Sequence, residues 1–113
     1  MRIPAPNFWP AARTGQRFLL QARRRETMVD GHKMVFLERG SPDVGRPTIV
    51  LIHGFAAMKE NWGLWLQRLP RHWHLLAPDL PGFGESDYRP EACYRYETQA
   101  RRLAQWLAGV NTD

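Results

Sequence analysis

The sequence predicts an α/β fold in which an N-terminal β-hairpin is followed by strand, helix, strand and helix. Three observations support this: an Asp-Gly dipeptide between two strand-like runs, two short apolar runs, and apolar residues at helical spacing after each of those runs. Alternating strands and helices bury their apolar faces when helices cover a mostly parallel sheet. The order of elements therefore indicates a layered α/β domain with an incomplete sheet.

The predicted hairpin pairs residues 25–29 with residues 32–38 across Asp30-Gly31. A tight type I′ turn needs positive φ at both central residues, and Asp-Gly is a favoured pair for it. The turn-forming residues of 40–47 prevent a regular ladder from continuing, so a new element is expected to begin at Thr48.

Residues 48–52 form a continuous β-branched and aliphatic run, which is typical of a strand buried on both faces. Residues 74–77 form a second such run. Because parallel strands need a crossover connection, the segment between them is expected to be a helix on one face of the sheet. That helix has its apolar face at helical spacing, formed by Trp62, Trp65, Leu66 and Leu69.

A second helix is expected after the turn-rich loop of residues 79–90. Its predicted outer face carries Glu97, Arg101 and Arg102. Its predicted apolar face consists of Tyr96, Ala100, Leu103, Leu107 and Val110.

The net charge of +5 is concentrated at the start of the chain. The first 25 residues contain six arginines and no acid, which leaves ten basic and eleven acidic residues in positions 26–113. Since the body is nearly neutral, a basic nucleic-acid surface on it is not expected. We therefore divide the chain into a basic aromatic arm, residues 1–24, and a folded body, residues 25–113.

Two interpretations of the arm remain open. It is either a lead-in that packs on the body, which we favour, or a basic amphipathic segment that lies on an anionic membrane. A lone Cys93 permits no internal disulfide, and no apolar run approaches the length of about 18 residues that spans a bilayer. We expect a cytoplasmic protein, with peripheral membrane contact through residues 1–24 as the alternative, and no cofactor.

The segment His53-Gly54-Phe55 follows the first apolar run, at the strand end where open α/β sheets bind their ligands. Gly54 lacks a Cβ, so the backbone can leave the strand sharply and approach a reacting group. The amide of Phe55 would then point into the pocket. His53 is expected to orient this loop by hydrogen bonding rather than to act as a base.

Together with the run Asp79-Leu80-Pro81-Gly82-Phe83-Gly84-Glu85-Ser86 after the second strand, this segment resembles the α/β-hydrolase family. The bacterial lipases and esterases similar to monoacylglycerol lipases are the branch it resembles most. The resemblance implies that the Phe55 N–H is an oxyanion-hole donor, supported by the turn at His53 and Gly54. It also implies that residues 25–113 are the N-terminal part of such a domain, truncated before the strand that carries the nucleophile.

No residue of the chain fits the other catalytic roles. Ser41, Ser86 and Cys93 all lack the G-x-S-x-G elbow of a nucleophile. Asp79 is expected to cap loop amides, and Gly82-x-Gly84 does not continue into a dinucleotide fingerprint because position 87 is Asp. His72 and His74 share a strand face but lack a third ligand, so no metal site is expected.

Two classes of function follow. The first is a fragment of a serine-type carboxylic-ester hydrolase that contributes an oxyanion segment, has no catalytic triad and gives no measurable turnover alone. The alternative is a short non-catalytic binding module that uses the basic arm or an exposed strand edge. An uncovered apolar edge at residues 48–52 is also expected to favour self-association.

Overall fold

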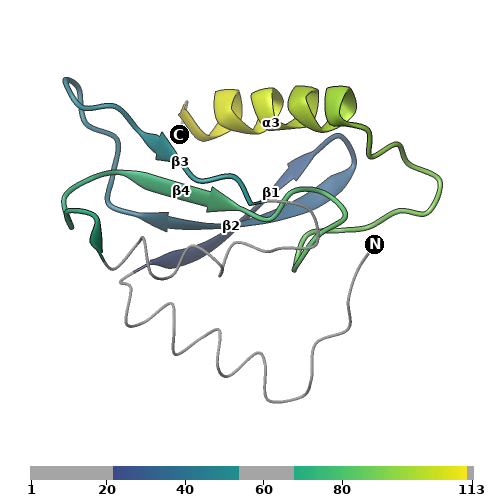
Figure 1. Cartoon of the computed structure of the whole chain (residues 1–113), viewed down its shortest axis with the longest axis horizontal. Coiled ribbons are helices and arrows are strands. Elements are labelled where there is room, and N and C mark those ends of the chain that lie inside the picture. Colours follow the sequence, from purple (N-terminus) through teal and green to yellow (C-terminus); the bar gives the residue numbers. More distant parts are fainter. Residues whose placement is uncertain (1–21, 54–67, 112–113) are drawn as a thin grey trace, which may run out of the picture.

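The computed structural model describes residues 22–53 and 68–111 (Figure 1). These residues form one four-stranded sheet in the order β1-β2-β4-β3, with helix α3 packed on one face. The β2 strand is antiparallel to both β1 and β4, and β3 is parallel to β4. This mixed, incomplete sheet confirms the predicted fold class. The elements are β1 (Arg23–Val29), β2 (His32–Arg39), β3 (Ile49–Val50), β4 (Leu75–Pro78) and α3 (Tyr96–Asn111).

The hairpin turn has the predicted conformation, since φ is 51° at Asp30 and 75° at Gly31. Val29 and His32 flank this turn and pair with each other in the antiparallel ladder. The strand β1 begins at Arg23, one residue before the predicted end of the arm at residue 24. Residues 1–21 lie outside the described residues, so the division into arm and body stays a prediction.

Of the two parallel strands, β4 is fully buried as predicted, whereas β3 is shorter and less buried than predicted. The strand β3 contains only Ile49 and Val50, and the Leu51 N–H donates to the Leu76 carbonyl at 2.8 Å just beyond it. Residues 49–51 are half-buried and Ile52 is exposed, so the prediction of a strand buried on both faces is wrong for the described structure. The reason is that β3 has a described neighbour on one side only, which is β4. Self-association through this edge stays a prediction.

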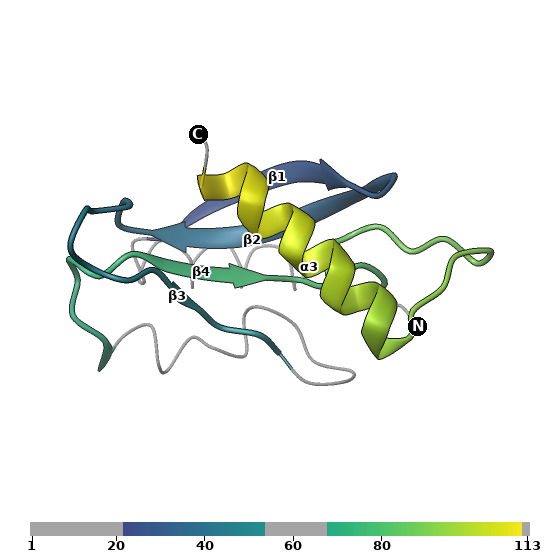
Figure 2. The same cartoon turned by 90° about the horizontal axis from the view of Figure 1, so that it is seen from above.

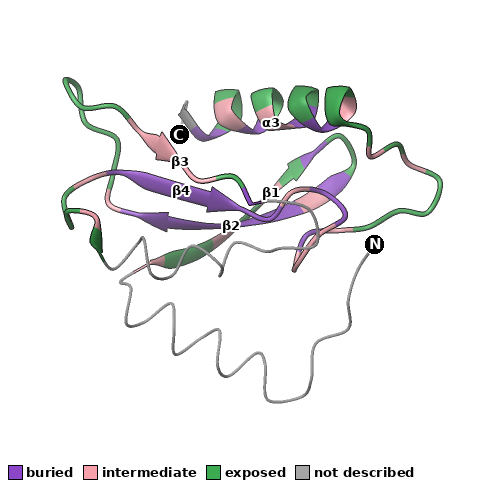
Figure 3. Ribbon diagram, viewed as in Figure 1, coloured by how far each residue is buried: buried purple, intermediate pink, exposed green. Residues whose placement is uncertain are grey.

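Apolar side chains cover both faces of the sheet, as the alternation of side chains along a strand requires. On the face under α3, one cluster joins Met34, Phe36 and Leu76 to the helix. On the opposite face, a second cluster is built on Leu37 and Leu75. Figure 2 shows α3 running across the sheet, and Figure 3 shows that β2 and β4 are its buried centre. The helix predicted around Trp62 falls outside the described residues.

The helix α3 forms where predicted, but its buried face is different. Tyr96 is 89% exposed and Ala100 is exposed as well, whereas Arg102 is only 3% exposed. The physical reason is that the Arg102 Nε–H donates to Asp30 Oδ2 at 2.8 Å, which draws this arginine onto the hairpin turn. The residues of α3 that face the sheet are Gln99, Arg102, Leu103, Trp106, Leu107 and Val110. No helix among the described residues is long and apolar enough to span a membrane.

Candidate active site

The candidate site lies where the parallel strands β3 and β4 end. Ligands of open α/β sheets bind outside the carboxyl ends of such strands. After β3 the chain continues to His53, which is buried, and after β4 it continues to Asp79, which is fully buried. Gly54 and Phe55 follow His53 directly but lie outside the described residues, so their expected roles stay predictions.

The His53 side chain connects the two strand ends. The Leu80 backbone N–H donates to its Nε2 at 3.0 Å. An accepting ring nitrogen carries no hydrogen, so this bond places the imidazole proton on Nδ1. The ring also packs edge-on against Phe83, with centroids 5.3 Å apart. His53 thus joins the end of β3 to the loop after β4.

Asp79 organises the loop that follows β4. Its Oδ2 accepts the Glu85 N–H at 2.9 Å, its own N–H donates to the Val35 carbonyl, and its carbonyl accepts the Ser86 hydroxyl at 2.6 Å. Gly84, with a φ of 53°, lies against the Asp79 carboxylate where a Cβ would not fit. These contacts confirm the prediction that Asp79 caps loop amides.

The same loop is fastened to β2 by its last two residues. The Ser86 Oγ accepts the Val35 N–H at 2.9 Å, and Asp87 Oδ2 accepts the Lys33 N–H at 2.8 Å. Ser86 is fully buried; its hydroxyl donates to the Asp79 carbonyl and accepts the N–H of Val35 on β2. Its hydroxyl is a structural group, in agreement with the absence of a nucleophile elbow.

Two polar residues of α3 also hold the loop: Gln99, which the sequence did not single out, and Arg102, which was predicted on the outer face. The Gln99 Nε2–H donates to the Pro81 carbonyl at 2.8 Å, and the Arg102 guanidinium donates to Gln99 Oε1 at 2.9 Å. Arg102 lowers the pKa of Asp30, chiefly through its hydrogen bond to that carboxylate. The sequence did contain a signal for this contact, because Gln99 and Arg102 are polar residues three positions apart on an otherwise apolar helix face.

Cys93 is exposed, because it lies in the loop before α3 rather than under the helix. Hydrogen bonds from the Thr98 hydroxyl, at 3.2 Å, and then from the Arg95 backbone lower its thiol pKa. No contact of Cys93 within the described structure connects it to the strand ends at His53 and Asp79.

His74 belongs to a buried polar network at the opposite end of the parallel strands. Its Nε2 lies 2.6 Å from Glu38 Oε2 and its Nδ1 lies 2.6 Å from the Thr48 hydroxyl. The other Glu38 oxygen accepts from Arg25 at 2.7 Å and lies 3.1 Å from Arg23. Both ring nitrogens of His74 are thus engaged. Among the described residues no three His, Cys, Asp or Glu side chains group as a metal site.

Because of this network, the stability of the fold at acid pH depends on the charge of Glu38. Burial alone would raise the pKa of Glu38, but the hydrogen bonds from His74, Arg25 and Arg23 outweigh it and lower the pKa below its usual value. A carboxyl whose pKa is lower in the folded state stabilises the fold above its unfolded-state pKa, about 4.3 for glutamate. That stabilisation is lost as the pH falls through the lower, folded-state pKa.

We therefore expect Glu38→Gln to reduce the free energy of unfolding by about 2 kcal/mol at neutral pH, because hydrogen bonds to a buried charge are lost. The difference from the wild type should shrink as the pH is lowered below about 4. Urea denaturation followed by circular dichroism at a series of pH values measures both effects. The exposed Glu91→Gln is the control. An equal loss at every pH would contradict the prediction.

The comparisons with known proteins agree with this geometry. Residues 47–111 match the family described as the alpha/beta hydrolase fold. The chain is 43% identical over 81 residues to Lipase 1 of Psychrobacter immobilis, which covers 72% of this chain and 25% of that protein. It is 27% identical over 82 residues to the monoacylglycerol lipase abhd6-B of Xenopus laevis, covering 73% of this chain and 24% of that protein.

Among solved structures, a membrane phospholipase A described as a bacterial virulence factor superposes with a TM-score of 0.79 at 39% identity. That match covers 90% of this chain and 34% of the other. The chain therefore belongs to the α/β-hydrolase fold family, and its relatives confirm the resemblance to the lipase and esterase branch. It spans about a quarter of the length of the curated relatives described above.

Proposed function

We propose that this chain forms the oxyanion side of a serine-type carboxylic-ester hydrolase that acts on lipids or related esters. The relatives named as lipases and as a phospholipase support the substrate class. The observation that carries the proposal is the hydrogen bond from Leu80 N–H to His53 Nε2, which joins the carboxyl ends of the two parallel strands. It fixes His53 at the carboxyl ends of the strands, where open α/β sheets bind their ligands.

From this position the Phe55 N–H would donate to the oxygen that becomes negative when an ester carbonyl is attacked. One such donor stabilises the transition state by about 3 to 4 kcal/mol. Gly54 provides the sharp exit from the strand, and His53 keeps that exit aligned with the loop after β4. The serine, its histidine base and the acid that orients the base would lie on segments outside these 113 residues. Residues 1–113 alone are then expected to give no steady ester hydrolysis.

A chimera tests the proposal directly. Residues of this chain would replace the 81 matched residues of the Psychrobacter immobilis lipase. We expect the chimera to hydrolyse nitrophenyl esters. Phe55→Pro, which removes the backbone donor and the side chain and also fixes φ, should lower kcat by about 100-fold to 1,000-fold. Phe55→Ala is the matched control, because it keeps the N–H.

The thermal melting temperature of each variant separates lost chemistry from lost folding. Equal losses of kcat in Phe55→Pro and Phe55→Ala would contradict the assignment of the Phe55 N–H. Steady hydrolysis by the purified 113-residue chain that disappears in Gly54→Val would contradict the assignment of the remaining catalytic groups to other segments.

A further inference from the structure

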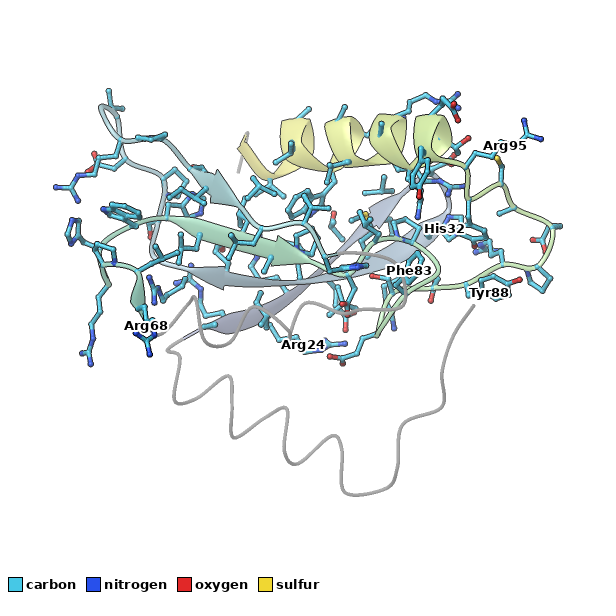
Figure 4. The ribbon with its side chains drawn as sticks, viewed as in Figure 1. Arg24, His32, Arg68, Phe83, Tyr88 and Arg95 are labelled. Atoms are coloured by element: carbon cyan, nitrogen blue, oxygen red, sulfur yellow. The ribbon has the colours of Figure 1, made fainter. Side chains whose placement is uncertain are left out.

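Positive charge gathers at the amino end of β4. The Arg23 guanidinium donates to the Gly40 carbonyl at 2.9 Å, and Arg39 donates to the carbonyls of Leu69 and Pro70. Arg68 lies at this end of the sheet, opposite Phe83 and His32 (Figure 4). We call this surface the basic end; it consists of the exposed Arg23, Arg68 and Arg71, and Arg39 lies buried next to it.

Within residues 22–53 and 68–111, one acid pairs with the basic end. It is Glu38, which binds Arg23 but is buried and is also bound to Arg25 and His74. Neither Arg68 nor Arg71 pairs with an acid anywhere in residues 22–53 or 68–111. Burial and then the nearby charge of Arg71 lower the pKa of Arg39, as expected where like charges crowd. The exposed arginines therefore present a net positive field to solvent.

Protection of a sheet edge does not account for these charges. Arginines on an edge strand discourage unwanted pairing, and Arg23 on β1 serves that purpose. Arg68 and Arg71, however, lie on the segment that leads into β4, which is a central strand. At this position they are accessible to an anion from solvent, which their summed positive field would attract.

Apolar side chains next to the arginines favour a lipid surface over a nucleic acid. Leu69 and Trp73 are half-buried beside Arg68 and Arg71, and they pack against the cluster that includes Leu37 and Leu75. A Trp with one end apolar and one end accessible suits a membrane interface, where arginines meet lipid headgroups. Because Trp73 packs on the core, it is poorly placed to serve as a stacking platform for bases.

We propose that the basic end docks on the surface of an anionic phospholipid bilayer. The docking uses charge–headgroup attraction from the exposed Arg23, Arg68 and Arg71, with Trp73 at the level of the headgroups. Docked in this way, the sheet holds His53, at the other end of the parallel strands, away from the lipid. The proposal concerns a surface separate from the candidate active site and does not depend on the proposed function.

The test is sedimentation of the full chain with vesicles of equal parts phosphatidylcholine and phosphatidylglycerol. We expect salt-sensitive binding to these vesicles and none to phosphatidylcholine alone. The double variant Arg68→Gln/Arg71→Gln should weaken binding on the order of 30-fold, from about 5-fold per arginine near the surface. The matched control is Arg95→Gln/Arg101→Gln, which removes the same charge from exposed positions next to and within α3 and should bind as the wild type does.

Several outcomes would overturn the proposal. Equal weakening by both double variants would show that net charge alone drives binding. Full loss of binding on deletion of residues 1–21, with no effect of Arg68→Gln/Arg71→Gln, would assign the binding to the arm. Absence of binding to anionic vesicles, or displacement from them by a short single-stranded RNA at lower concentration than free lipid headgroup, would also refute it.

Discussion

Gly84→Ala is expected to lower the free energy of unfolding by about 3 to 4 kcal/mol. An added Cβ at this position would overlap the Asp79 carboxylate, which is fully buried and accepts the Glu85 N–H. Moving that carboxylate breaks its hydrogen bonds, which costs about 1 to 3 kcal/mol, and the left-handed backbone adds about 1 to 2 kcal/mol for any residue with a Cβ. Urea denaturation followed by far-ultraviolet circular dichroism measures the change.

Gly31→Ala is the matched control for this experiment. Gly31 also has a positive φ, 75°, but a Cβ there meets no atom within 4 Å. It should therefore cost only the backbone term, about 1 to 2 kcal/mol. The difference between the two variants isolates the contact with Asp79. If both variants lose the same stability, the Asp79 carboxylate does not constrain the loop in the way described.

Trp106→Ala is expected to destabilise the chain by about 4 kcal/mol, because it leaves a large cavity under α3. Trp106 is 1% exposed and its ring lies edge-on to Phe36, with centroids 5.2 Å apart. Among the described residues it is the largest fully buried side chain, and it joins the helix to the hairpin and β4. The same denaturation measurement reports the loss.

Trp106→Phe separates ring packing from hydrogen bonding. The indole Nε1 is buried without a hydrogen-bond partner in the described structure. Replacing it by Phe keeps most of the apolar contact and removes an unsatisfied N–H, whose burial is itself unfavourable. We expect a loss of only about 1 kcal/mol, from the smaller ring. A loss as large as that of Trp106→Ala would mean that the indole N–H makes a bond that this geometry does not include.

Most of the fold could be predicted from local patterns. The Asp30-Gly31 turn has the required positive φ values, and the apolar runs before His53 and around Leu76 became the parallel strands β3 and β4. These features depend on residues that are neighbours in the chain. Backbone preference and side-chain period are enough to specify them.

The phase of α3 could not be predicted in the same way. Helical spacing alone placed Tyr96 inside and Arg102 outside, yet the reverse is observed. Arg102 is buried because Asp30, 72 positions earlier in the chain, supplies the opposite charge. The burial of a charged side chain depends on whether a partner meets it, and spacing within one helix carries no information about that partner.

The candidate site likewise has features that depend on neighbouring residues and features that depend on long-range contacts. The sequence His53-Gly54-Phe55 indicates a turn at the end of an apolar run. The glycines of the loop after β4 indicate tight turns there. The family follows from these residues, because they carry backbone conformations that few other residues can adopt. The sequence thus contains the class of fold, the order of its elements and the segment that would face a substrate.

Long-range contacts determine the features of the site that local sequence did not predict. The bond from Leu80 to His53, the capping of β2 by Ser86 and Asp87, and the Glu38–His74–Thr48 network each join segments that lie far apart in the chain. A hydrogen bond forms only when donor and acceptor come within about 3 Å in a suitable direction, and that depends on the register of the folded sheet. Which polar residues are buried and paired, and which arginines stay exposed at the basic end, is therefore a property of the packed chain.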